Sequence, residues 1–359
     1  MKITLLMPDS LKSSARPVAI WLLIGVGMII IQVLLGGITR LTESGLSITE
    51  WKPLTGALPP LNHEQWLAEF ERYRHTDQFR YIHADFSLRD FKFIFFWEWL
   101  HRLWARLLGV VFLVGFFYFL IKKSFKKEMI LPMIILFLLG ALQGMIGWLM
   151  VKSGLVPEKM FVGHVELATH FIAALGLLCY TFWFALSLLI LPGEFVINTG
   201  LKRFAIAVVC ILVVQLIYGA FMSGLKAATA APTWPDINGS LVPGEMNNLS
   251  PWWKNLFDNK IMVQFLHRTI AYLLTLSVVA WFIKARKIKH EGLFNNTKWL
   301  PVILILLQVV LGILTVITSP FGDSLVWFGL AHQFTGMLFL TCMIWILFLV
   351  RSDPKAITA

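Results

Sequence analysis

Two short stretches of this sequence carry a histidine and charged or polar side chains inside apolar runs. EWLHRLWARL, residues 98–107, and QFLHRTIAYL, residues 264–273, share a Leu-His-Arg core, but Glu98 in the first corresponds to Gln264 in the second. Imidazole binds metal ions, and a carboxylate one helical turn away can exchange protons with a bound group or stabilise a developing cation. We therefore expect both stretches to bind the same kind of group, and the first alone to support chemistry on it.

Four histidines lie at similar depths in four predicted apolar helices: His101, His170, His267 and His332. Each follows the start of its apolar run by about six to eight residues, which at ~1.5 Å per residue puts it roughly 9 to 12 Å below the outer end. A single histidine in a helix is more often a packed residue than a ligand. Ionisable groups in membrane spans are costly and face the bundle interior, so four of them at one level indicate a functional site.

The histidines form two pairs, His101 with His170 and His267 with His332. Paired imidazoles on two helices of a bundle suit a metal ion or a macrocycle with two axial positions. Zinc needs further Cys, His or carboxylate ligands at each centre, and the second pair has no carboxylate near it in the predicted spans. Haem needs only two axial nitrogens and an apolar slot. We interpret the pairs as two haem sites.

Arginines accompany both pairs near the predicted outer surface. Arg102 and Arg268 each directly follow one of the histidines, and Arg40 and Arg106 lie nearby. Guanidinium groups pair well with haem propionates, although snorkelling to lipid headgroups is an alternative. For Arg102 and Arg268 we favour propionate pairing or ordering of the bundle.

Glycines also recur in or near the spans. Each either lets a flat ring approach the helix backbone or serves ordinary helix packing. They are Gly36, Gly37, Gly109, Gly140, Gly144, Gly219, Gly312 and Gly336.

The elements that position these residues are transmembrane helices. The chain has 359 residues, of which 58% are hydrophobic and 14% are charged, and its mean hydropathy is +0.74. This is much less charge than soluble domains carry. Apolar runs of about 20 residues, the length that crosses a bilayer, predict eight spans at 17–38, 93–121, 129–151, 163–191, 203–222, 260–283, 299–318 and 326–350. We expect an all-α integral membrane protein surrounded by the lipid bilayer.

The net charge of +11 comes largely from lysines and arginines gathered in short connections between the spans. This is the positive-inside pattern. It predicts cytoplasmic chain ends, with residues 39–92, 152–162 and 223–259 facing outward. A nucleic-acid partner is therefore not expected.

An internal repeat relates the two parts of the chain. A shift of 183 residues superposes Gln32 on Gln215, with further identities in the loop that follows each. The repeat predicts two pseudo-symmetric four-helix bundles, residues 1–195 and 196–359. An even number of spans in each half makes the repeat parallel, about an axis along the membrane normal. Transporters also use such repeats, so the architecture alone does not choose a function.

The long outer loop, residues 39–92, contains an amphipathic segment. Trp66, Phe70 and Tyr73 recur in it at helical spacing among charged residues, which predicts a helix lying over the outer mouth of the bundle. The histidines of this loop are expected to be solvated: His63, His75 and His83.

Five segments together resemble the haem A synthase family, in the subgroup of the mitochondrial enzymes and their proteobacterial relatives. They are GGITRLTESGLSITEWKPLTGALPP, FKFIFFWEWLHRLWARLLG, ELATHF, VQFLHRTIAY and LAHQFTGM. The resemblance covers nearly the whole chain. It implies an enzyme of the bacterial inner (plasma) membrane that oxidises the C8 methyl of haem O to the formyl group of haem A, by successive hydroxylations and loss of water, for cytochrome c oxidase biogenesis.

The same resemblance implies roles for the site residues. His101 and His170 would surround the substrate haem beside the catalytic Glu98, and His267 and His332 would ligate a haem b that relays electrons. The implied partners are the farnesyltransferase that produces haem O and an electron donor that the sequence does not identify. One branch of the family carries a cysteine pair in an outer loop, which this chain lacks.

The sequence also allows a homo-oligomer, because glycines on exposed helix faces permit self-association.

Other functions stay open at this point. A dihaem b-type membrane cytochrome that only transfers electrons would share the four histidines, but it would not need Glu98 beside one pair. A haem or ion transporter would move its substrate without oxidising it. Prenyl transfer to haem is disfavoured because the chain lacks the Asn-Asp-x-x-Asp pattern that holds magnesium diphosphate.

Overall fold

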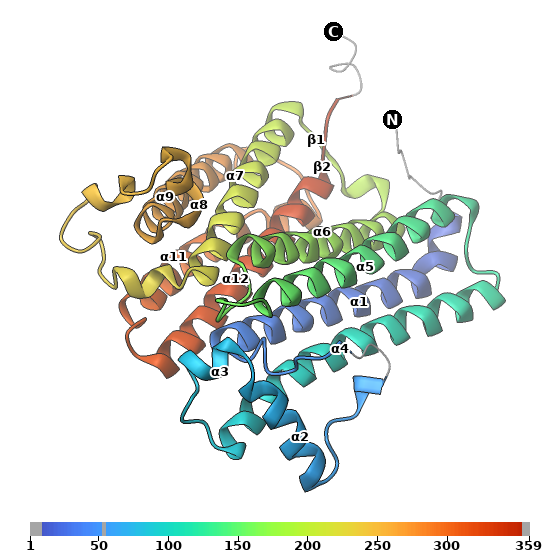
Figure 1. Ribbon diagram of the computed structural model, residues 1–359. Coiled ribbons are helices and arrows are strands. Elements are labelled where there is room, and N and C mark those ends of the chain that lie inside the picture. The colour runs from blue at the N-terminus through green and yellow to red at the C-terminus, as the bar shows by residue number, and fades with distance from the viewer. Residues whose placement is uncertain (1–8, 52–54, 354–359) are drawn as a thin grey trace.

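The computed structural model describes residues 9–51 and 55–353. In these ranges eight helices are long and apolar enough to cross a membrane, which confirms the predicted all-α membrane fold. They are α1 (Asp9–Leu41), α4 (Leu88–Ile121), α5 (Lys127–Gly154), α6 (His164–Leu189), α7 (Thr199–Gly224), α9 (Lys260–Ala285), α11 (Leu300–Ile317), preceded by the short α10 (Leu293–Thr297), and α12 (Gly322–Leu349). Figure 1 shows them as one bundle of long helices.

Several spans begin where a polar side chain caps the helix, because the first backbone N–H groups of a helix need acceptors. At α4 the Ser87 side chain accepts from Asp90 N, and the Asp90 carboxylate accepts from Ser87 N in return. At α7 the Asn198 side chain accepts from Leu201 N at 2.8 Å. Asn259 caps α9 in the same manner. The capping residues place the helix starts outside or at the edge of the apolar runs.

The number of residues between the helix start and the histidine differs from the expectation for two of the four histidines. α4 begins at Leu88 and α12 at Gly322, both earlier than their apolar runs indicated. His101 and His332 therefore lie further along their helices than expected. Contacts between helices, described below, bring each pair together.

The centre of the bundle is formed by α1, α6, α7 and α12, which pack on one another, while α4 packs on α1 and α9 on α7. One continuous apolar core runs through the four central helices and includes Leu22, Leu178, Leu212 and Met343, each at most 2% exposed. The two predicted halves thus share a core. Their boundary and pseudo-symmetry stay predictions.

The described ends of the chain lie at one end of the bundle. The short strand β1 (Val196–Ile197), in the connection between α6 and α7, pairs in parallel with β2 (Val350–Arg351), which follows α12. α1 starts at this same end, while α2 (His63–Arg74) and α3 (Asp77–Tyr81) lie at the opposite end (Figure 1). Which end faces the cytoplasm stays a prediction.

The amphipathic helix predicted in the outer loop is confirmed as α2. Its Trp66 ring meets Phe95 edge-on at 5.0 Å between centroids, and its Phe70 ring lies 5.1 Å from Phe91. Tyr73 is fully buried beside them. The apolar face of α2 is therefore packed on the N-terminal part of α4.

Candidate functional site

His101 lies on α4 and faces α1. Gln32 Nε2 of α1 is 3.2 Å from His101 Nδ1 and 3.3 Å from its Nε2. One turn further along α1, a Cβ on Gly36 would come within 3.1 Å of the imidazole Cε1. The absence of a side chain at Gly36 therefore makes room for the ring.

His170 lies on α6 and faces α5 in the same way. Gln143 Nε2 of α5 is 3.1 Å from His170 Nδ1, and a Cβ on Gly147 would lie 2.8 Å from the imidazole Cε1. His101 and His170 are close enough to interact electrostatically. The structure therefore brings the first predicted pair together.

His267 on α9 and His332 on α12 form the second pair. Their ring centroids are 6.4 Å apart, and the ring planes are inclined at 72°. Gln215 Nε2 of α7 is 3.2 Å from His267 Nδ1, and Gln308 Nε2 of α11 is 3.2 Å from His332 Nε2. Each imidazole of this pair is again matched with one glutamine.

Each of the four histidines thus meets a Gln-x-x-x-Gly motif on a different helix. The motifs are QVLLG (32–36), QGMIG (143–147), QLIYG (215–219) and QVVLG (308–312). A Cβ on the terminal glycine would lie between 2.8 and 3.4 Å from the imidazole Cε1 in every case. A spacing of four puts both residues on one helix face. None of the sequence predictions named this motif, although its recurrence in four spans was a usable signal.

The separation of the second pair would suit two imidazoles that hold one iron between them. Metal–imidazole bonds are about 2 Å long, so the two ligand nitrogens lie about 4 Å apart. The ring centres then lie roughly one ring radius further out on each side, which agrees with the 6.4 Å between centroids. Among the described residues, no group of three or more His, Cys, Asp or Glu side chains is placed to share a metal ion. Two nitrogens per centre are the donor set that a haem uses.

Glu98 is buried between α4 and the loop that follows α1, with 2% of the residue exposed. Its Oε2 accepts from Ser47 Oγ at 2.7 Å and from Ile48 N at 2.8 Å, and its Oε1 accepts from Arg102 at 2.6 Å. An ionised carboxylate accepts hydrogen bonds and donates none. Three donors around one carboxyl group therefore suit the charged form of Glu98.

The second half makes corresponding contacts without the charge. Gln264 donates to Ala231 O at 2.9 Å, and Arg268 donates to Thr233 O and Asp236 O, both at 2.7 Å. The shift of 183 residues relates Ala231 and Thr233 to positions 48 and 50, whose carbonyls accept from Arg102. Both stretches therefore hold the loop after the preceding span, and only the first does so with an ion pair.

The arginines donate hydrogen bonds to main-chain carbonyls of the loops and of a neighbouring helix. Arg102 and Arg268 donate to main-chain carbonyls of the loops that follow α1 and α7. Arg102 and Arg106 also line a hollow of about 490 Å³ between α2, the loop after α1 and α4. Arg40 donates to the carbonyls of Ser223 and Gly224 at the end of α7. Pairing with propionates stays a prediction.

The prediction for the loop histidines is wrong for His83. His63 and His75 are exposed as expected, but His83 is buried, with 6% of the residue exposed. Its Nδ1 is 2.6 Å from the Tyr73 hydroxyl, and its ring stacks on Phe86 at 3.9 Å. The contacts come from the fold of α2 and α3 over α4, which the polar local sequence did not reveal.

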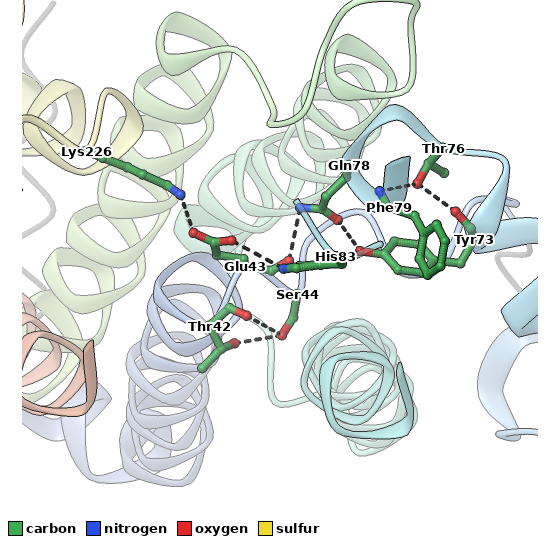
Figure 2. Close-up of polar contacts among 9 residues, drawn as sticks. All are labelled: Thr42, Glu43, Ser44, Tyr73, Thr76, Gln78, Phe79, His83 and Lys226. Carbon is green, nitrogen blue, oxygen red and sulfur yellow. Dashed lines mark hydrogen bonds and ion pairs between the residues drawn. The ribbon is translucent and has the colours of Figure 1, made fainter. Parts of the chain in front are cut away.

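His83 belongs to a polar cluster that joins the outer loop to the second half of the chain. Its Nε2 lies 3.4 Å from a carboxylate oxygen of Glu43, and the Lys226 ammonium forms an ion pair with the same carboxylate. Gln78 donates to Glu43 O at 3.2 Å, as Figure 2 shows. The hydrogen bonds from His83 and Lys226 lower the pKa of Glu43 to about 2.

The fold and the site together define an integral membrane protein that carries two pairs of histidines, each imidazole with its own glutamine. The chain belongs to the family of cytochrome oxidase assembly proteins, whose sequence model matches residues 19–344. A relative named heme A synthase from Rhodospirillum centenum is 41% identical over 98% of this chain and 93% of its own length. A heme A synthase from Rhodopseudomonas palustris is 44% identical over 91% of this chain and 89% of its own. A third, from Nitrosospira multiformis, is 38% identical over 92% of each chain. The resemblance seen in the sequence is confirmed.

Proposed function

We propose that this protein is a haem A synthase, which oxidises the C8 methyl of haem O to the formyl group of haem A for cytochrome c oxidase. The observation that carries the proposal is the similarity to relatives named heme A synthase, which extends over 98% of the chain in one of them and so spans both histidine pairs. The bacterial relatives and the eight membrane spans support a place in the inner membrane. The proposed source of haem O is a farnesyltransferase.

The first half is the proposed substrate site. His101 and His170 flank the substrate haem, and Glu98 lies one helical turn from His101. Because three donors surround the Glu98 carboxylate, its charged form suits stabilisation of positive charge that develops at the methyl carbon. Gln264 has no charge to offer at the corresponding place in the second half. This asymmetry favours oxidation at the first pair.

The second half is the proposed site of a resident haem b, held by His267 and His332. When bound, haem b supplies one-electron chemistry. The protein contributes the two imidazoles at a suitable separation, an apolar surrounding, and Arg268 at the outer side for a propionate. The electron donor is expected to be a separate partner.

Expression of the full chain in a host that supplies haem O tests the proposal. We expect extracted pigments to contain haem A and its hydroxylated precursor when they are analysed by mass spectrometry. If the extract contains only haem b and unchanged haem O, as it does in the host without this protein, the result would instead support the electron-transfer cytochrome. The exposed His75 provides a matched control: His75→Ala should leave product and haem content unchanged, whereas His267→Ala should lose the resident haem.

A further inference from the structure

The four glutamines share a feature that their contact with the imidazoles does not explain. Each turns its amide Nε2 toward an imidazole nitrogen at 3.1 to 3.2 Å. The other end of each amide, Oε1, is buried and has no hydrogen-bond partner among the described residues. These atoms belong to Gln32, Gln143, Gln215 and Gln308. A buried carbonyl oxygen without a donor is destabilising, so its recurrence beside all four histidines calls for a function.

The chemistry of a ligand histidine supplies the missing donor. A neutral imidazole carries one N–H donor and one acceptor nitrogen. An iron bound to the acceptor nitrogen leaves the N–H of the ring in need of a hydrogen-bond acceptor. A half-turn of the terminal torsion of glutamine exchanges Oε1 and Nε2, which are nearly equal in shape. The carbonyl of Gln215 then lies where the N–H of His267 requires it. At Gln32 and Gln143 the same exchange would give up the hydrogen bonds that Nε2 donates to His101 O at 3.2 Å and to His170 O at 3.1 Å.

We propose that Gln215 is a positioning residue, whose carbonyl oxygen accepts the N–H of the iron-ligating His267 and so fixes its tautomer and raises its basicity. The inference rests on the proposed function, because it presumes that the histidine pairs bind haem. The glycine one turn further on completes the unit by leaving space for the ring.

The contact at His332 differs from the others in one respect. Its Nδ1 lies 3.0 Å from the main-chain carbonyl of Gln308, while its Nε2 faces the side chain of the same residue. Here the main chain already provides an acceptor for the N–H. Replacement of the Gln308 side chain should therefore matter less than replacement of Gln215, whose contacts with His267 come from the side chain.

The test uses the full-length protein, purified from a host that makes haem b and no haem O, with a redox titration of the bound haem. Gln215→Leu removes the acceptor, so we expect haem retention to weaken roughly 10- to 100-fold and the midpoint potential to rise, because a less basic ligand stabilises ferric iron less. Gln215→Glu offers a stronger acceptor and should lower the potential with haem retained. Opposite shifts from one position distinguish positioning of the ligand from a general loss of packing.

Two control variants set the scale. Gln333 lies next to His332 in the chain, but its amide donates to Val33 O at 2.8 Å and not to an imidazole, so Gln333→Leu should keep the wild-type potential. Gln308→Leu should shift it less than Gln215→Leu does. Unchanged potentials in both Gln215 variants, or shifts of the same sign, would overturn the inference. Retention of haem by His267→Ala would overturn the proposed function itself, whatever the glutamine variants do.

Discussion

At the residue scale, Glu98 combines a structural and a proposed catalytic role. It accepts three hydrogen bonds that fasten the loop after α1 to α4. Glu98→Gln keeps the size of the side chain but removes its charge, so we expect turnover of haem O to fall by roughly 10²-fold or more, the usual effect of losing one electrostatic contact to a transition state. Product formation per molecule of enzyme, followed by pigment extraction, measures this loss.

Ser47→Ala is the matched control for Glu98→Gln. It removes the 2.7 Å hydrogen bond from Ser47 Oγ but leaves the carboxylate and its ion pair with Arg102. We expect a much smaller decrease in turnover, with the haem of the second half retained in both variants. Wild-type turnover in Glu98→Gln would remove Glu98 from the chemistry and leave it a loop anchor.

At the element scale, helices approach each other closely at the Gln-x-x-x-Gly motifs, and on α11 this approach requires a glycine at position 312. A Cβ on Gly312 would lie 2.9 Å from His332 Cε1, whereas a Cβ on Gly219 of α7 would lie 3.4 Å from His267 Cε1. Gly312→Ala should therefore displace its imidazole and lower the amount of bound haem, while Gly219→Ala should nearly preserve it. The ratio of haem to protein after purification checks the difference.

The helices themselves should tolerate both replacements, because alanine favours a helix over glycine by about 1 kcal/mol. Thermal unfolding followed by circular dichroism should show no loss of helix stability in either variant. Equal haem content in Gly312→Ala and Gly219→Ala would show that the ring has room to move and that the glycine of the motif serves helix packing alone.

At the scale of the whole molecule, Glu43 and Lys226 join the two predicted halves. The repeat shift of 183 residues relates one to the other, and both adopt left-handed backbone conformations, with φ of 58° and 52°. Reversal of either charge alone, Glu43→Lys or Lys226→Glu, should lower the melting temperature. The double exchange should recover much of the loss, with a coupling of about 1 kcal/mol. If the double variant loses as much stability as the two single variants together, the ion pair does not hold the halves together.

The same cluster predicts a pH dependence. The pKa of Glu43 is lowered from 4.5 to about 2 by hydrogen bonds from His83 and Lys226, with Arg40 also near the carboxylate. A lowered pKa stabilises the folded protein above pH 4.5, and this stabilisation is lost as the pH falls from 4.5 toward 2. The melting-temperature difference between wild type and Glu43→Gln should thus be constant near neutral pH and narrow below about pH 4.5. A difference at pH 3 as large as the difference at pH 7 would contradict the assignment.

Local features of the sequence were enough to predict the membrane class, the eight spans and the four histidines. The length of an apolar run is a property of consecutive residues, and the bilayer imposes it on each span separately. The Leu-His-Arg repeat similarly marks its own positions. Helix starts were less well predicted, because polar caps such as Ser87 lie outside the apolar run.

The tertiary structure decided which polar groups meet. Gln143 and Gln308 belong to the recurring Gln-x-x-x-Gly motif, but only their contact with a histidine on another helix shows what the motif does. His83 lies in a polar loop, yet α2 and α3 bury it against Tyr73. Glu43 pairs with Lys226, far away along the chain. The sequence by itself thus determined which segments cross the membrane and which histidines lie in them, whereas the partners of those histidines depend on contacts between distant segments that exist only in the folded bundle.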